Sequence, residues 1–376
     1  MRTLYGTSAC HGRVGHRPGR SYLLGAGILR CRVRCKSAVE GAAALKTGPR
    51  PLVIATRGSK LALEQTRQVQ QLLHAAAQLR GEVLQLSTVE LKTTGDNSPT
   101  APLRSLGAGA FADAVDDAVA SGAADMGVHS LKDCPSTLPE GLLLAACLPR
   151  ADPRDCLIAG DEGVRSLRDL VPGSRVGTSS SRRAAQIRHS FPHLQVVELR
   201  GNVDARLQRI RAREISATVL ARAGIQRLGL EEEVGARVLS TDEMLPAACQ
   251  GAVGVVCREG DAWVAEQLAA ISHRPTRLEV AAERACLAAL LGSEEAGRGG
   301  QAFPAIAWAA HTRYDPDAGL MGIDCFVSDL EGRDLIRYTE FARSVVDETD
   351  AESLGSLYGT LLRMAAAGNG WIPLDL

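Results

Sequence analysis

Aromatic side chains and long apolar segments are both scarce in this chain of 376 residues. Phe, Tyr and Trp make up 3% of the sequence, which argues against the stacking surfaces that bind single-stranded nucleic acid. No uncharged apolar run approaches the roughly 18 residues expected of a membrane-spanning helix. We therefore expect neither nucleic acid nor membrane as a partner of this globular chain.

Paired cysteines and several common catalytic motifs are also missing. The ten cysteines form no CxxC pair and no Cys/His cluster at zinc spacing, so we expect neither a metal site nor a disulfide framework. The sequence has no P-loop, GxGxxG, HExxH or Ser-His-Asp elbow. NTPases, dinucleotide enzymes, zinc peptidases and α/β-hydrolases are thereby disfavoured, and most thiols are expected to be buried packing groups.

Lysine is rare, since the chain has 38 Arg and five Lys. Residues 1–50 hold eight of those Arg and two of the Lys, and Glu40 is their only acidic residue. This composition, without an apolar core, predicts a transit peptide. We favour the plastid, with a mitochondrial protein or a cytoplasmic one with an untargeted, disordered tail as alternatives. The remaining chain has nine more acidic than basic residues, which disfavours nonspecific nucleic-acid binding.

Strand and helix patterns alternate from Pro51 to about residue 250, which predicts α/β domains with mainly parallel sheets covered by helices. Expected strands are Pro51–Thr56, Val83–Leu91, Asp125–His129, Arg175–Gly177, Leu194–Leu199, Thr218–Ala221 and Ala252–Cys257, and expected helices are 61–80, 111–120, 180–189 and 203–213. A polar, Gly- and Pro-containing loop is expected at Thr93–Pro102.

The pattern changes after residue 274, where two helices (276–291 and 351–366) enclose three short strands. This predicts a small α+β domain. The expected organisation is therefore a leader at 1–50, a first domain at 51–150 completed by about 250–270, a second at 151–249, and the α+β domain at 274–376.

Two polar motifs follow predicted strands of the first domain. In IATRGSKLA, Arg57 and Ser59 lie between a strand end and a helix start, where open α/β sheets bind ligands and anions. In VHSLKDCP, Ser130, Lys132 and Asp133 directly follow a strand, and Lys132 would keep the Asp133 carboxylate ionised. The alternatives are a helix cap with a solvated Arg57, and a surface turn whose ion pair contributes little.

Two strand–turn–helix junctions of the second domain carry hydroxyls and arginines. They read VGTSSSRR and LRGNVDAR, within a stretch from Arg154 to Arg237 that holds 15 Arg and no Lys. Hydroxyls and free backbone N–H groups at a helix start bind anions, and forked guanidiniums suit carboxylates. We therefore predict a site for a polyanionic ligand, although several of these arginines could be solvated helix residues. The candidates are Thr178, Ser179, Ser180, Arg182, Arg183, Arg200, Gly201, Asn202 and Arg206.

Eight motifs, in order and spacing, resemble the porphobilinogen deaminase (hydroxymethylbilane synthase) family from about Pro51 to Arg284. They are IATRGSKLAL, HSLKDCP, DPRDCLI, GTSSSRR, LRGNVDARL, AGIQRLGL, QGAVGV and AERA. The resemblance implies two domains like type II periplasmic binding proteins with a cleft between them, plus a third α+β domain. We expect a monomer.

The resemblance implies a transferase of porphyrin (heme and chlorophyll) biosynthesis. Members join four porphobilinogen molecules, releasing ammonia each time, to give hydroxymethylbilane, and they start on a dipyrromethane cofactor held by a thioether to a third-domain cysteine. The alternatives are an impaired paralogue that binds porphobilinogen or linear tetrapyrroles without turnover, and an unrelated solute-binding module. Retention of Lys132, Asp133 and the paired arginines argues against the solute-binding module.

The resemblance also implies roles for individual residues. Asp133 matches the catalytic aspartate, beside Lys132. Arg57, Arg182, Arg183, Arg200 and Arg206 match the arginines that bind the acetate and propionate groups of each pyrrole. The other expected binding positions are Ser59, Gln65, Ser130, Thr178, Ser179, Ser180, Gly201, Asn202 and Gln250, and the last of these is also expected at the crossing between domains.

The anchoring cysteine is the main departure from the family pattern. In the aligned loop Gly299–Pro304, Gln301 stands where the family has Cys, and an amide cannot form the thioether. The family's lysine-containing glycine loop before Phe111 is one residue shorter here and has no Lys. Cys286 and Cys325 are candidate substitute anchors, with buried packing as the alternative for both.

Overall fold

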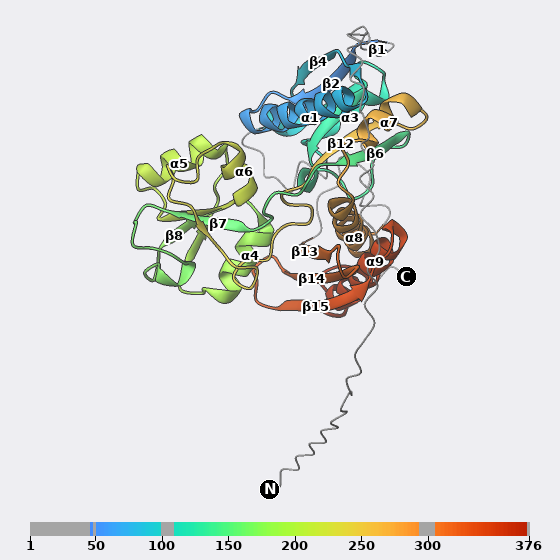
Figure 1. Cartoon of the computed structure of the whole chain (residues 1–376). Coiled ribbons are helices and arrows are strands. Elements are labelled where there is room, and N and C mark those ends of the chain that lie inside the picture. The colour runs from blue at the N-terminus through green and yellow to red at the C-terminus, as the bar shows by residue number, and fades with distance from the viewer. Residues whose placement is uncertain (1–45, 48–49, 99–108, 293–304, 374–376) are drawn as a thin grey trace, which may run out of the picture. The chain divides into compact units, whose positions relative to one another are not determined.

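The computed structural model describes residues 46–47, 50–98, 109–292 and 305–373. Most of the predicted leader and the loop containing Gln301 lie outside these residues. Leu45–Leu376 form one compact unit built on three main sheets (Figure 1). β1 (Lys46–Thr47) lies inside the segment that we expected to be leader, and its two residues pair with β3 (Glu82–Val83).

The first main sheet has the strand order β4-β2-β5-β12-β6. Its central strands bury nearly every side chain, as expected of a sheet covered on both faces. Helices α1 and α3 lie against this sheet in Figure 1. The elements are β2 (Leu52–Arg57), α1 (Lys60–Leu79), β4 (Leu86–Leu91), α3 (Asp113–Ala120), β5 (Met126–Ser130), β6 (Leu142–Cys147), β12 (Val253–Arg258) and α7 (Ala262–Ala269).

The second main sheet has the order β11-β7-β10-β8-β9. Its helices begin directly after strand ends, so their N-termini meet at one edge of the sheet. The elements are β7 (Asp155–Ala159), β8 (Arg175–Gly177), α4 (Ser181–Ser190), β9 (Gln195–Val197), α5 (Val203–Arg211), β10 (Ala217–Ala221), α6 (Arg222–Arg227) and β11 (Arg237–Val238).

In each of these sheets four strands share one direction and the fifth is reversed. The reversed strands are β12, antiparallel to β5 and β6, and β7, antiparallel to β10 and β11. Each is the first strand formed after the chain crosses from the other sheet. The predicted mainly parallel α/β class is therefore confirmed.

The third sheet is antiparallel, with order β13-β14-β15. Two long helices pack together and cover it, and a core of apolar side chains lies between them and the sheet. The elements are α8 (Arg274–Leu291), β13 (Ile306–Asp315), β14 (Leu320–Asp329), β15 (Leu335–Ser344) and α9 (Glu348–Gly368). The predicted small α+β domain is thus confirmed as a fold, with longer strands than expected.

Sequence patterns misjudged several short elements. The expected loop after Thr93 begins with a helical turn, α2 (Thr94–Asn97), because Thr93 and Asp96 form a capping box. Strands β6 and β7 and helices α6 and α7 were not expected. β6 is a uniform apolar run without alternation, and α6 has only six residues, so neither gives a periodic signal.

Helix α9 packs against α8 through glycine. A Cβ on Gly355 would lie 1.9 Å from the Ala282 carbonyl oxygen, and one on Gly359 would lie 2.2 Å from the Cys286 carbonyl oxygen. We predict that Gly355→Ala lowers the free energy of unfolding by about 1–3 kcal/mol, because the helices must move apart. Gly368→Ala, where a Cβ meets nothing within 4 Å, should be neutral or stabilising. Urea denaturation of both variants checks this, and equal effects would contradict it.

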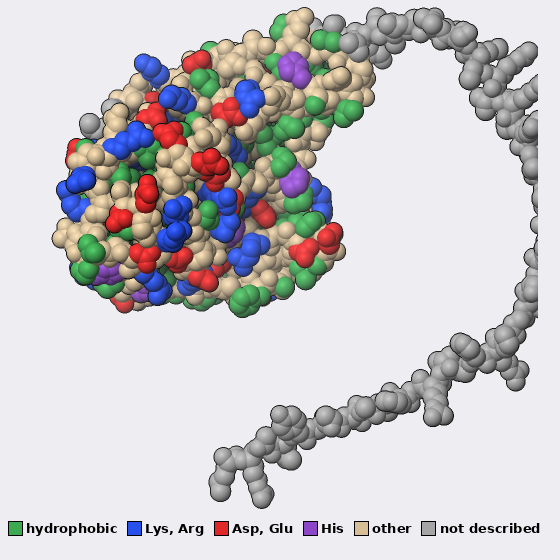
Figure 2. Space-filling model, turned by 60° about the vertical axis from the view of Figure 1, so that its left-hand side comes forward, with side chains coloured by type: hydrophobic (Ala, Val, Ile, Leu, Met, Phe, Trp, Pro, Cys, Tyr) green, Lys and Arg blue, Asp and Glu red, His purple; other side chains and the backbone are tan. Residues whose placement is uncertain are grey.

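No helix among the described residues is long and apolar enough to cross a membrane. Figure 2 shows Lys and Arg interspersed with Asp and Glu on the face in view. On that face neither charge sign forms a continuous patch of the kind that steers a polyelectrolyte.

Candidate active site

The loop after β5 carries Lys132 and Asp133 on a single 3-10 turn, Leu131–Asp133. Leu131 is buried and fixes the turn to the core, whereas Lys132 is exposed and Asp133 is partly buried. Asp133 has neither a hydrogen bond nor an ion pair with any residue that the structure describes. A partly buried carboxylate in this condition is available to a ligand.

Gln65 and Ser130 link α1 to the end of β5. The Gln65 amide nitrogen lies 2.8 Å from Ser130 Oγ, and Ser130 Oγ lies 3.1 Å from the Gln65 amide oxygen. Gln65 is almost fully buried. Ser59 caps α1 by accepting from the Ala62 N–H at 3.3 Å. These three predicted binding residues therefore hold the end of β5 and the start of α1 in place, whatever they contribute to a ligand.

Arg57, at the end of β2, forms a two-point ion pair with Asp96 of α2. Its guanidinium also lies over the Phe111 ring, 4.6 Å from the centroid. Burial lowers the pKa of Arg57, but Asp96 and then Asp133 outweigh it and raise the pKa. Asp133 therefore lies within the electrostatic reach of Arg57. The partner, Asp96, gave no signal in the sequence beyond its capping position.

Arg182 and Arg183 open α4 and share one buried carboxylate. Arg182 Nη1 lies 2.8 Å from Asp155 Oδ2, and Arg183 Nη2 donates to Asp155 Oδ1 at 2.8 Å. Asp155 is fully buried at the start of β7. Burial raises the pKa of Asp155, but the two guanidiniums outweigh it and hold the pKa far below its usual range. The sequence predicted the arginines and missed Asp155, although it lies in the DPRDCLI motif.

The hydroxyls predicted to bind anions shape the turn between β8 and α4. Thr178 Oγ1 accepts from the Ser180 N–H at 3.1 Å, and Ser180 Oγ caps α4 by accepting from the Arg183 N–H at 3.4 Å. Ser179 and Ser180 are partly exposed, and Thr178 is buried. The helix start thus presents Ser179 and Ser180 together with its free N–H groups.

Arg200 and Arg206 bring further positive charge to this edge. Asn202 caps α5 by accepting from the Ala205 N–H at 2.9 Å, and Gly201 takes the left-handed φ of 102° that the turn requires. Burial and then the charges of Arg183 and Arg200 lower the pKa of Arg206 to about 10, with Glu198 opposing them. Arg183 and Arg200 therefore both repel Arg206, and an anion would relieve this repulsion.

The predicted site residues of the first sheet and those of the second sheet share one electrostatic environment. Desolvation lowers the pKa of Lys132, with Asp133 and Asp155 opposing it and Arg183 and Arg182 adding to it. The Lys132 side chain nevertheless keeps access to solvent, so its charge remains available. Lys60 of α1 also pairs with Asp204 of α5 at 3.0 Å. Residues that follow strands of two different sheets therefore act on each other.

Gln250 has structural partners. It is almost fully buried on the segment that returns to the first sheet, and its amide donates to Pro153 O at 2.7 Å and to Asp155 Oδ1 at 2.9 Å. These bonds tie the two crossing segments together. The expectation that Gln250 lies at the crossing matches this geometry, while its contact with a ligand stays a prediction.

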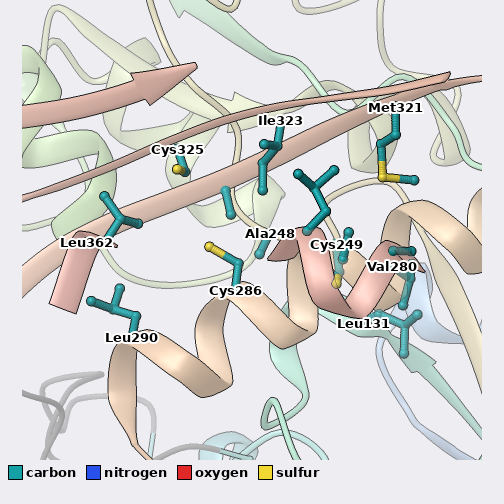
Figure 3. Close-up of a cluster of buried hydrophobic side chains, with 14 of the residues drawn as sticks. Leu131, Ala248, Cys249, Val280, Cys286, Leu290, Met321, Ile323, Cys325 and Leu362 are labelled. Carbon is teal, nitrogen blue, oxygen red and sulfur yellow. The ribbon is translucent and has the colours of Figure 1, made fainter. Parts of the chain in front are cut away.

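The candidate anchors Cys286 and Cys325 lie in the core of the third sheet, and both are fully buried (Figure 3). Cys286 on α8 points toward Cys325 on β14, and its pKa is raised by that contact and by burial. Ile323, Leu290 and Leu362 pack beside them. Buried thiols of this kind are inert.

Next to the Lys132–Asp133 turn, His129 forms a buried ion pair with Asp116 of α3, with Nε2 2.9 Å from Oδ1. Burial lowers the pKa of His129, but Cys134 and Asp116 outweigh it and raise the pKa to about 10.

Because its folded pKa lies above the unfolded value of 6.5, His129 should stabilise the fold fully below pH 6.5 and progressively less as the pH rises through about 10. Urea midpoints across that window should fall in the native chain, and this slope should be absent in His129→Gln. Equal slopes in both proteins would show that His129 is not charged in the fold.

A family model described as "Porphobilinogen deaminase, dipyromethane cofactor binding domain" matches residues 52–266. The chain belongs to the porphobilinogen deaminase family. Over 267 residues it is 43% identical to the chloroplastic porphobilinogen deaminase of Oryza sativa subsp. japonica, covering 70% of this chain and 72% of that protein. Over 325 residues it is 40% identical to the porphobilinogen deaminase of Nitratidesulfovibrio vulgaris (strain DP4), covering 82% and 97%.

An ancestral arginine-binding protein bound to arginine also aligns with this porphobilinogen deaminase family chain. Its TM-score is 0.33 at 14% identity, over 59% of this chain and 90% of that one.

The described residues fit the dipyrromethane named in the family description. Such a group carries carboxylates, and the second sheet offers Arg183, whose Nε is buried without a hydrogen-bond partner among the described residues, beside the mutually repelling Arg200 and Arg206. The donor chemistry is therefore suitable for an acidic oligopyrrole. The family's usual thiol position, Gln301, lies outside the described residues.

Proposed function

We propose that this chain is a hydroxymethylbilane synthase, which condenses four porphobilinogen molecules in sequence, with loss of ammonia, into a linear tetrapyrrole. The observation that carries the proposal is the Asp133 carboxylate. This carboxylate has no hydrogen bond or ion pair with the described residues, and it lies beside Lys132 and within the electrostatic reach of Arg57. The chain that carries it belongs to the porphobilinogen deaminase family.

In this proposal the arginines and hydroxyls bind the acidic pyrroles. Arg183, Arg200 and Arg206 would hold the acetate and propionate groups of the bound pyrroles, with Ser179 and Ser180 at the start of α4. A dipyrromethane, when bound, supplies the pyrrole carbon to which the first substrate is joined. Because Arg183 and Arg200 repel Arg206 in the free protein, charge neutralisation favours the acidic ligand over neutral pyrroles.

Asp133 is placed to stabilise positive charge on the substrate. Loss of ammonia leaves the methylene carbon and its pyrrole ring electron-poor, and a fixed carboxylate near the ring nitrogen lowers the energy of that state. The same carboxylate can assist the proton transfer that completes each condensation. Lys132 is the neighbour of Asp133 in the chain and adds positive charge beside that carboxylate.

The proposal is tested by incubating the purified protein with porphobilinogen and measuring ammonia release, substrate consumption and formation of hydroxymethylbilane. Sustained turnover is expected. Binding of porphobilinogen without ammonia release would instead favour the impaired paralogue. That alternative is motivated by Gln301, which replaces the family's thiol.

Removing one guanidinium should weaken substrate binding. We expect Arg206→Gln to raise KM for porphobilinogen about 10-fold or more with a smaller change in kcat, since a charge-assisted hydrogen bond contributes about 1.5–3 kcal/mol. Arg211→Gln, at an exposed position on the same helix and paired with Glu233, is the matched control. Equal KM values for the two variants would remove Arg206 from the binding site.

We further propose a plastid location for this protein. The Arg-rich composition of residues 1–50 and the similarity to the chloroplastic proteins of rice and of Pisum sativum support it. A fluorescent-protein fusion of residues 1–50 should accumulate in plastids of a plant cell. We expect the folded enzyme to act as a monomer on porphobilinogen, and light scattering of the purified protein checks this.

A further inference from the structure

The start of α1, a helix of the first sheet, contacts two helices of the second sheet. Lys60 Nζ lies 3.0 Å from Oδ2 of Asp204, which is in the first turn of α5. The next residue, Leu61, lies beside Gly224 of α6, where an added Cβ would stand 3.6 Å from Leu61 Cδ2. An ion pair and an apolar contact therefore lie next to each other between the two sheets.

Glu64, one helical turn after Lys60, acts on the second sheet as well. Burial lowers the pKa of Arg227 of α6, and the charge of Glu64 opposes that shift. Residues four positions apart share one face of a helix. This face of α1 therefore meets α5 and α6, the helices that follow strands β9 and β10.

The ion pair lies among the predicted ligand-binding residues. Lys60 directly follows Ser59, and Asp204 lies between Asn202 and Arg206 on the next strand–turn–helix junction. A ligand held by these residues would lie beside the pair. The two side chains are 81% and 50% exposed, so the pair can open and close without disturbing a core.

The stability of α1 does not explain the lysine. Lys60 is the first residue of the helix, where the positive end of the helix dipole repels a cation. Residues 60–63 (KLAL) include no acid that would offset this repulsion, and the whole chain has only five Lys against 38 Arg. The ion pair with Asp204 offsets the repulsion from the other sheet.

We propose that the Lys60–Asp204 ion pair is a latch between the helices of the two sheets, and that it slows the dissociation of an acidic pyrrole bound beside it. The inference rests on the proposed function for the class of ligand and adds two positioning residues to it. Because the pair is exposed, its loss should weaken binding only about two- to fivefold.

Asp204→Asn is the decisive variant, because attraction and latching predict opposite results. The substitution removes a negative charge near an anion site, so electrostatic attraction alone would tighten the binding of a dicarboxylate. Loss of the latch should instead raise the dissociation constant about two- to fivefold. The ligand is the pyrrole acetate–propionate without the aminomethyl group, which cannot release ammonia, and calorimetry measures its binding. Unchanged or tighter binding would overturn the proposal.

A charge swap separates the latch from a local effect on α5. Asp204 also stabilises the start of that helix, so its loss could by itself disturb Asn202. The double variant Lys60→Asp/Asp204→Lys is worse for the helix start but forms the ion pair again. It should bind the analogue more tightly than Asp204→Asn, and equal or weaker binding would overturn the latch.

Glu233→Gln is the matched control for Asp204→Asn. Glu233 pairs with Arg211 at 3.1 Å, both side chains are exposed, and the pair joins elements of the second sheet only. The variant changes net charge equally and should keep the dissociation constant of the parent. Circular dichroism confirms that each variant is folded.

Carbodiimide cross-linking tests the contact without any ligand. The reagent takes up water as it joins a carboxylate and an amine into an amide, and it does so only where the two groups touch. Peptide mapping of the full-length protein should find Lys60 joined to Asp204, with a lower yield at high salt, because salt screens exposed charges. Absence of this peptide pair would overturn the latch.

Turnover of porphobilinogen by the parent separates this inference from the proposed function. If the parent turns over porphobilinogen but all variants bind the analogue equally, the latch is overturned and the synthase stands. If the parent shows the cross-link but binds no dicarboxylate pyrrole and consumes no porphobilinogen, the proposed function is overturned and the retention role with it.

Discussion

An Asp133→Asn protein is expected to fold as the parent does and to consume porphobilinogen about 10²- to 10⁴-fold more slowly. The amide matches the carboxylate in size but carries no negative charge, so it cannot stabilise the positive charge that forms as ammonia leaves. Because Asp133 has no hydrogen bond or ion pair with the described residues, its replacement breaks no contact that supports their fold. The measurement is kcat at saturating substrate, together with the urea midpoint.

Asp117 provides the matched control for this experiment. It is an exposed carboxylate on the neighbouring helix α3, and Asp117→Asn changes net charge equally. We expect its kcat to stay within about twofold of the parent. Near-normal turnover by Asp133→Asn would remove the central residue from the proposed mechanism and require another catalytic group.

An Asp155→Asn protein is expected to lose about 3–5 kcal/mol of its free energy of unfolding. The substitution leaves the buried guanidiniums of Arg182 and Arg183 without their shared counterion. Glu162→Gln, at an exposed position just beyond β7, should change the stability by less than about 0.5 kcal/mol. Urea denaturation at neutral pH measures both, and similar midpoints would contradict the assigned role of Asp155.

The pH dependence of this contribution follows from the direction of the pKa shift. The folded pKa of Asp155 lies below the unfolded value of about 3.9. The contribution is therefore fully present above that value and is lost as the pH falls toward the folded pKa. The parent should lose stability on acidification below about pH 4 more steeply than Asp155→Asn, which has no such carboxylate to protonate.

The polar motifs at strand ends were the most predictable part of this molecule. The sequence places Lys132 and Asp133 after a buried strand and Arg182 and Arg183 at a helix start, and the structure has them there. These predictions succeed because short motifs determine their own caps and turns. In the linear sequence, nothing distinguished the arginines with internal partners from the others that we predict to bind a ligand.

The carboxylates that hold the arginines could not be assigned from the sequence. Asp96 and Asp155 lie 39 and 28 positions from the arginines that they bind, and only the fold brings them together. The same holds for Glu283, which is buried and accepts from Arg150, from the Cys249 N–H and from the Thr312 N–H. The sequence alone does not show whether an Asp or Glu is buried, because its burial depends on a partner that lies far away in the chain.

Two mainly buried strands, β6 and β7, were not predicted from the sequence. β6 and β7 are short and almost uniformly apolar, so they lack the alternation that marks a strand with one wet face. β6 pairs with β12 and the reversed strand β7 pairs with β10, and both partners lie far along the chain. Topology of this kind is set by long-range contacts.

One oxygen atom of Asp155 bonds both to an arginine of the proposed anion site and to a residue on a segment that crosses between the two sheets. Asp155 Oδ1 accepts both from Arg183, which faces the proposed anion site, and from Gln250, which is bonded to Pro153 on the other crossing segment. A carboxylate ligand that competed for Arg183 would weaken one of the two hydrogen bonds at this oxygen, and the hydrogen bond from Gln250 would then remain to hold the two crossing segments together.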